Sequence, residues 1–168
     1  STPSTRRPLT ESGLTQVTAV LTACSGFLLA VLWMDLIFDV QVLRHRRAGH
    51  ALPDSVLTSI TGYYHRATTT SRPMSYLIVL VMLVLLGALA VEIAGGRRSG
   101  WLSTSWAVLA VFPIGLAVRT VRDAVRLGER TDGVLEQSRL ARSVCRDHIV
   151  CFVCLALFLG VTLQVAQA

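Results

Sequence analysis

The sequence predicts an all-α integral membrane protein, an antiparallel four-helix bundle with a short interfacial helix in its first cytoplasmic loop. Three observations lead there: an apolar composition, four long apolar segments, and arginines gathered in particular loops. Hydrophobic residues make up 52% of the 168-residue chain and charged residues only 15%. This balance is too apolar for an ordinary soluble domain, and the length fits a single domain over residues 1–168.

Each apolar segment is close to the roughly 20 residues that a helix needs to cross a bilayer. The predicted spans are Leu14–Phe38, Met74–Ala94, Trp101–Val118 and Ile149–Val165. The first is too long for a cleavable signal peptide, and Asp35 near its end and Asp39 directly after it come without a small-residue cleavage site. We therefore expect it to remain as a span.

The basic residues predict the orientation. All sixteen are arginine, a bias typical of GC-rich genomes such as those of actinobacteria. Twelve lie in the first and third loops, whereas the N-terminal tail and the second loop hold Arg6, Arg7, Arg97 and Arg98. Because positive charge favours the cytoplasmic side, we expect a plasma-membrane protein with both termini extracytoplasmic and a tight outer turn at "GGRRSG". The net charge of +6 is thus assigned to lipid headgroups and not to nucleic acid.

The two cytoplasmic loops are predicted to be largely helical. In "PDSVLTSITGYYHRAT" the apolar residues fall at helical spacing after Pro53 and Asp54, which predicts a short helix lying along the membrane surface. Pro73 suits the first turn of the second span. The third span is expected to continue through "RTVRDAVRLGER" and to break near Asp132 and Gly133, and the fourth helix to start near Leu135.

Polar residues gather at the predicted cytoplasmic ends of the helices, which an antiparallel bundle brings together. The candidate catalytic residues are Asp123, Asp147, His148, Arg122 and Arg146, and the candidate substrate-binding residues are Asp35, Asp39, Tyr64, His65 and Arg119. Ionisable groups at membrane depth pair with one another or line a cavity. One interpretation is a set of ion pairs that fixes packing. The other is a polar pocket for a lipophilic substrate.

The stretch "CRDHIVCFVC" raises the question of metal or redox chemistry. On a helix Cys145 points away from Cys154, so the potential ligands do not converge, and no metal site is predicted within the stretch. A metal site shared with Asp35 or His65 stays open. "CFVC" has the C-x-x-C form of membrane thiol oxidoreductases such as vitamin K epoxide reductase, but a second cysteine pair is missing. His65 and His148 lie at helix ends and not at mid-span, where a b-type haem would need them. Thiol redox and haem binding stay as further alternatives.

The layout resembles the anthrone-oxygenase-like family of small four-helix membrane proteins. "TVRDAV" falls where that family carries Pro-Leu-Asn-Asp-Ala-Leu, and "RDHIVC" falls where it carries Trp-Asn-His-Val-Arg-Thr. Asp123, Ala124 and His148 match, and Asp147 stands for an Asn. The departures are Val118 and Arg122 for the two Asn, Thr120 for Pro and Val150 for Arg.

The resemblance implies an oxidoreductase or oxygenase acting on an aromatic polyketide or quinone-like molecule, without a bound cofactor. Asp123, Asp147 or His148 would then be the general base, and Arg122 or Arg146 would stabilise the anion. The sequence itself names no cofactor. The competing interpretation is a non-catalytic accessory subunit of a larger membrane complex, with a contact face at Ser103, Thr104, Ser105 and Pro113. The expected partners are the lipid bilayer and either a lipophilic small molecule or a membrane subunit.

Overall fold

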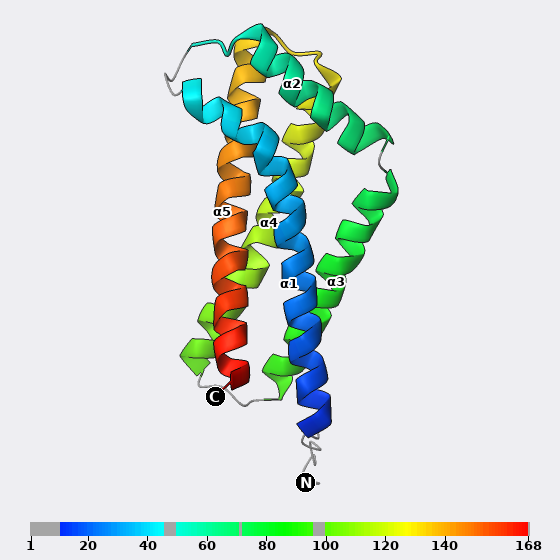
Figure 1. Cartoon of the computed structure of the whole chain (residues 1–168), viewed down its shortest axis with the longest axis vertical. Coiled ribbons are helices and arrows are strands. Elements are labelled where there is room, and N and C mark those ends of the chain that lie inside the picture. Colours follow the sequence, from blue (N-terminus) through cyan, green and yellow to red (C-terminus); the bar gives the residue numbers. More distant parts are fainter. Residues whose placement is uncertain (1–10, 46–49, 71, 96–99, 168) are drawn as a thin grey trace, which may run out of the picture.

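The structure is a computed structural model that describes residues 11–45, 50–70, 72–95 and 100–167, and these residues form helices and short connections without strands (Figure 1). The "GGRRSG" turn falls mostly outside the described residues, so its form stays a prediction. The elements in chain order are α1 (Glu11–Asp39), η1 (Val40–His45), α2 (Asp54–His65), η2 (Arg66–Thr70), α3 (Arg72–Ala94), α4 (Gly100–Glu129) and α5 (Val134–Gln167).

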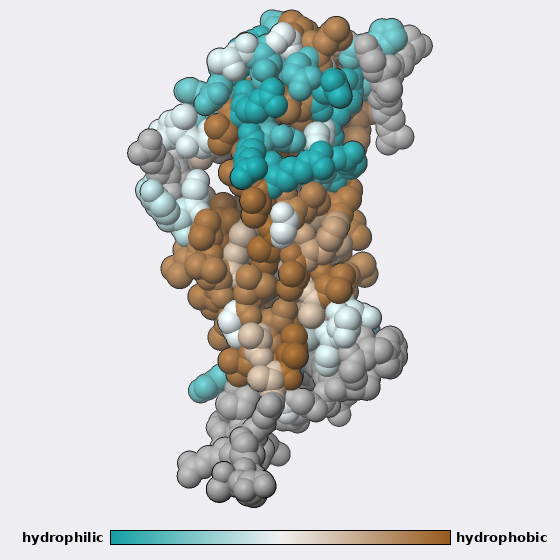
Figure 2. All heavy atoms as spheres, turned by 180° about the vertical axis from the view of Figure 1, so that it is seen from behind, coloured by the Kyte–Doolittle hydropathy of each residue, from teal (hydrophilic) through white to brown (hydrophobic). Residues whose placement is uncertain are grey.

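Among the described residues, four helices are long and apolar enough to cross a membrane, as the hydropathy of the sequence predicted. They cover Thr15–His45, Pro73–Ala94, Ser103–Glu129 and Val134–Gln164. Figure 2 shows a broad hydrophobic surface around their middle and a hydrophilic cap at the end where α2 lies. We call this end the α2 end, and the opposite end, where α1 begins and α5 stops, the far end.

The short helix predicted in the first long loop is present as α2, which begins directly after Pro53. It lies across the α2 end of the molecule (Figure 1). Its inward face is buried against α4 and α5 and forms the α2-end core, whose members include Leu57, Ile60, Leu127 and Val144. The backbone N–H of Leu52, just ahead of α2, donates to Ser138 Oγ at 2.9 Å and ties this segment to the start of α5.

The far-end core lies between α1, α3, α4 and α5 and is almost wholly apolar. Trp106 of α4 stacks on Phe158 of α5 with ring centroids 5.1 Å apart. The indole Nε1 of Trp106 donates to Thr162 Oγ1 at 3.0 Å, which satisfies a polar atom that is buried from solvent.

Pro113 lies inside α4, where its missing N–H leaves the Leu109 carbonyl without its usual helical donor. Its own carbonyl accepts a hydrogen bond from Cys151 Sγ at 3.6 Å. Pro113 is buried toward α5, so the contact face predicted at Ser103, Thr104, Ser105 and Pro113 loses that member. Beyond the proline α4 continues to Glu129, and the chain turns at Arg130, whose φ is 53°.

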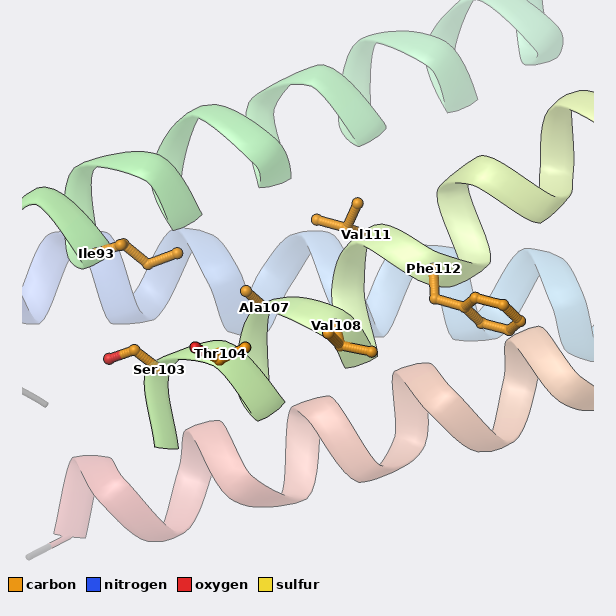
Figure 3. Close-up of a pocket in the computed structure, with 7 residues that line it drawn as sticks. All are labelled: Ile93, Ser103, Thr104, Ala107, Val108, Val111 and Phe112. Atoms are coloured by element: carbon orange, nitrogen blue, oxygen red, sulfur yellow. The ribbon is translucent and has the colours of Figure 1, made fainter. Parts of the chain in front are cut away.

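Helix α3 packs mainly along α1 and diverges from the other helices (Figure 1). Much of its surface is exposed and apolar, including Tyr76, Val79 and Leu83. Between α3 and α4 at the far end lies an open groove of about 540 Å³ (Figure 3), lined by Ile93, Ser103, Thr104, Ala107, Val108, Val111 and Phe112. A groove with this lining offers apolar contact and few polar atoms.

Candidate functional site

A buried contact between a histidine and a carboxylate joins the end of α1 to the middle of α5. Asp39 is fully buried and His148 nearly so, and His148 Nδ1 lies 2.6 Å from Asp39 Oδ2. Because an ionised carboxylate can only accept, this contact assigns the Nδ1 proton to the imidazole ring. The other ring nitrogen, Nε2, lies 4.0 Å from Asp35 Oδ2, beyond hydrogen-bond distance.

Two adjacent tyrosines of α2 donate hydrogen bonds to the carboxylates of α1. Tyr64 Oη donates to Asp39, at 2.8 Å from Oδ1 and 3.0 Å from Oδ2, and lies 3.3 Å from His148 Nδ1. Tyr63 Oη donates to Asp35 Oδ1 at 2.6 Å. Three helices thus contribute to one set of contacts, which we call the Asp–His cluster: Asp35, Asp39, Tyr63, Tyr64 and His148.

Local helix geometry explains why these side chains meet. Asp35 and Asp39 are four residues apart, so both carboxylates lie on the same face of α1. Tyr63 and Tyr64 are neighbours about 100° apart around α2, which lets each reach a different carboxylate. Phe38 stacks on Tyr63 with ring centroids 4.2 Å apart and holds α2 against α1.

The environment keeps both tyrosines in the protonated form in which they can donate. Burial, followed by the negative charge of Asp39, raises the pKa of Tyr64 far above its ordinary value. Burial and the hydrogen bond to Asp35 raise the pKa of Tyr63 in the same direction. Each phenol therefore stays neutral at physiological pH.

A second polar group lies next to the cluster on α5. Asp147 is buried, and its Oδ1 lies 3.1 Å from the Nη2 of Arg146, whose side chain is largely exposed. Its other oxygen, Oδ2, accepts from Thr120 Oγ1 of α4 at 3.3 Å. This group joins α4 to α5 and uses both oxygens of Asp147 within the molecule.

The structure brings together only some of the residues that the sequence singled out. Asp35, Asp39, Tyr64 and His148 converge, and Arg146 and Asp147 lie beside them. The other four lie elsewhere: Arg119 contacts Ser143 at 3.4 Å, Arg122 and His65 are exposed, and Asp123 is half-buried on α4. Among the described residues, no hydrogen bond or ion pair joins the matched motif position Asp123 to the other matched position, His148.

Two contributors were not among the predicted site residues. Tyr63 holds Asp35 and Thr120 holds Asp147. The sequence signal for Tyr63 was that it stands next to Tyr64, and that two acids, Asp35 and Asp39, lie one helical turn apart and can each accept from one tyrosine. Thr120 lies within "TVRDAV", one helical turn before Ala124, but a lone threonine gives no sequence signal of a buried partner.

The cysteines show no arrangement for redox or metal chemistry in the part of the chain that the structure describes. All four thiols are free, Cys145 is buried in the α2-end core, and Cys151 donates to Pro113. No group of three or more His, Cys, Asp or Glu residues able to hold a metal ion is found among the described residues. His65 is exposed at the end of α2, whereas His148 is buried.

The two described cavities are lined by residues outside the cluster. The groove between α3 and α4 contains none of its residues, nor does a smaller hollow of about 320 Å³ at the α2 end, lined by His50, Leu135, Glu136, Arg139 and Arg142. The most accessible acid of the cluster is Asp35, whose side chain is 17% exposed, compared with 1% for Asp39. Access to the cluster from outside is therefore at Asp35.

No protein-family model, no curated protein and no solved structure matches this chain. The resemblance to the anthrone-oxygenase-like family thus depends on the quoted motifs alone.

Proposed function

We propose that this chain is a multi-pass plasma-membrane protein whose four spans form an antiparallel bundle. In this proposal α2 lies at the cytoplasmic surface, and the start of α1 and the end of α5 are extracytoplasmic. The excess of arginine in the loops at the α2 end supports this orientation. The hydrophilic cap over the apolar band in Figure 2 supports an interfacial position for α2.

We further propose that the Asp–His cluster is an acid–base centre of a small oxidoreductase or oxygenase that acts on a lipophilic aromatic or quinone-like molecule. The observation that carries this proposal is the 2.6 Å contact between Asp39 and His148 Nδ1. A carboxylate on one ring nitrogen fixes the tautomer and leaves the other nitrogen to exchange a proton. Here that nitrogen is Nε2, on the side of the more accessible Asp35.

The chemistry begins with a proton transfer. Nε2 accepts a proton from a weakly acidic C–H or O–H group, and the electron pair of that bond stays on the substrate as a delocalised anion. The new imidazolium then lies next to the anion and stabilises it. Dioxygen is the oxidant that this reaction requires: the anionic carbon forms a C–O bond with it, and the imidazolium returns its proton to the resulting peroxide. Loss of water from that hydroperoxide leaves a carbonyl group on the substrate.

The test measures oxygen consumption with anthrone as the probe, in nanodiscs that hold the purified protein. We expect H148Q to lose the catalysed rate by about 100-fold or more, the usual contribution of a general base. H65Q is the matched control, because His65 is exposed and outside the cluster. Oxidation no faster than in empty nanodiscs, or equal rates for wild type and H148Q, would rule out this activity.

The second candidate is the non-catalytic accessory subunit. It is favoured by the closure of the cluster, in which the Asp39 oxygens accept from Tyr64 and His148 and neither described cavity reaches the site. Here the cluster would fix packing only. Native mass spectrometry in mild detergent distinguishes the two candidates: the subunit role predicts a stoichiometric partner chain together with no oxygen consumption.

A further inference from the structure

Helices α2 and α4 cross at Gly128 with almost no space between their backbones. A Cβ atom at Gly128 would lie 2.8 Å from the backbone nitrogen of His65, 3.0 Å from the carbonyl carbon of Tyr64 and 3.1 Å from the His65 Cα. All three atoms are backbone, so no side chain can rotate away to make room. Only the absence of a side chain allows α2 to lie this deep.

The neighbouring residues on the same face of α4 are also small. Thr120, Ala124 and Gly128 are spaced four apart and are all buried. Small residues at this spacing let helix backbones approach closely. Ala124 packs in the α2-end core with Leu57, Ile60 and Tyr64. The crossing of α2 and α4 therefore lies next to Tyr64, the residue that covers the Asp–His cluster.

We propose that Gly128 is a positioning residue that sets the depth of Tyr64 and thereby the hydrogen bonding of His148. Relieving the contact with a Cβ requires the His65 nitrogen to move from 2.8 Å to at least the 3.4 Å of ordinary contact. Tyr64 precedes His65 and would move with it. Its oxygen is held by bonds of 2.8 and 3.0 Å to Asp39, which a displacement of this size weakens steeply.

The consequence for His148 follows from its burial. Tyr64 Oη lies 3.3 Å from His148 Nδ1 and covers the contact between Asp39 and His148. Once α2 is lifted, water reaches the Nδ1 proton and exchanges it. The role of Gly128 in catalysis rests on the acid–base function proposed above, whereas its effect on this proton does not.

The experiment is NMR of protein carrying ¹⁵N-histidine, in detergent or nanodiscs, with the His148 signal identified by its loss in H148Q. We expect a slowly exchanging low-field Nδ1 proton in the wild type and loss of that signal in G128A. Y64F should cause the same loss, because it removes the same cover. G115A is the matched control, since Gly115 lies on the same helix and a methyl group added there would meet nothing within 4 Å.

A folded G128A protein that keeps the wild-type His148 signal would overturn the proposal, as would equal loss in G115A. If G128A does not fold, A124S provides a milder intrusion one turn earlier in the same crossing. An unchanged signal in folded A124S would then be decisive against it. Oxygen consumption is not read in this experiment, so a failure of the proposed activity leaves its outcome unaffected.

Discussion

The two ends of the molecule are held together by different chemistry. At the α2 end, charged and hydroxyl side chains from three helices contact one another in directional pairs, and α2 closes over them. At the far end the core is largely apolar, with the Trp106–Thr162 contact between helices and Ser25 bonded to its own helix, and an open groove lies between α3 and α4. Directional contacts permit one arrangement, whereas apolar packing between helices in a hydrocarbon solvent tolerates several. The α2 end is therefore where specific chemistry can be held in place.

The largest effect should come from Asp39. We expect D39N to lower the free energy of unfolding by about 3 kcal/mol, because it removes the negative charge and puts an NH2 donor in place of one of the two oxygens that accept from buried Tyr64 and His148. D54N is the matched control: Asp54 also pairs, at 2.7 Å with Arg130, but its side chain is 85% exposed. Exposed pairs contribute little. Thermal unfolding in detergent measures both, and equal losses would contradict the contrast between the ends.

A pair of valines compares the ends directly. Val144 is fully buried in the α2-end core, and Val108 is 55% exposed on the groove. We expect V144A to lower the free energy of unfolding by about 2 kcal/mol, because it leaves a cavity, and V108A to lower it by less than about 0.5 kcal/mol. Denaturant titration of the two variants side by side would show the difference. If V108A lowered the free energy of unfolding as much as V144A, Val108 would have to be buried, and the groove would be closed by packed side chains.

High pH should weaken the α2 end first. The folded pKa of Tyr64 is raised above its unfolded value near 10, so its contribution to stability is complete below pH 10 and declines above it. The slope is about 1.4 kcal/mol per pH unit for one phenol, with less from half-buried Tyr63 because solvent screens it. In a Y76F background, tyrosinate absorbance should appear only as helix signal is lost. Ionisation near pH 10 in a folded protein would contradict this.

The smallest effect concerns the far end. We expect T162V to cost about 0.6 kcal/mol, the average for a hydrogen bond between helices in a membrane. A double-mutant cycle with W106F isolates the contact between the two side chains. A coupling energy as large as the loss in D39N would remove the distinction drawn between the ends.

The sequence was sufficient for the elements that depend on local pattern. Hydropathy located the four long helices, and helical spacing after Pro53 located α2. It also predicted that Asp35, Asp39, Tyr64 and His148 share one neighbourhood, because each lies at the same predicted end of its helix.

The sequence could not predict which residues of α4 face the cluster or how deeply α2 packs against α4. Asp123 and His148 both match the motifs of one family, yet among the described contacts none joins Asp123 to the cluster, whereas Thr120 of the same helix bonds to Asp147. The depth of α2 is set by the missing side chain at Gly128, and a glycine in a long helix looks the same in a sequence whether or not another backbone crosses it. Neither hydropathy nor spacing carries that information.

Two of the polar contacts between α4 and α5 restrict the sliding of one helix along the other. Trp106 meets Thr162 at one end and Thr120 meets Asp147 at the other, and along α4 these positions are about 21 Å apart at 1.5 Å per residue. Two apolar helices side by side can slip by a turn with little change in contact area. A shift of α4 along α5 would break both contacts at once. The two contacts therefore fix the two helices against translation along their axes, and a displacement at one end moves both helices as one unit.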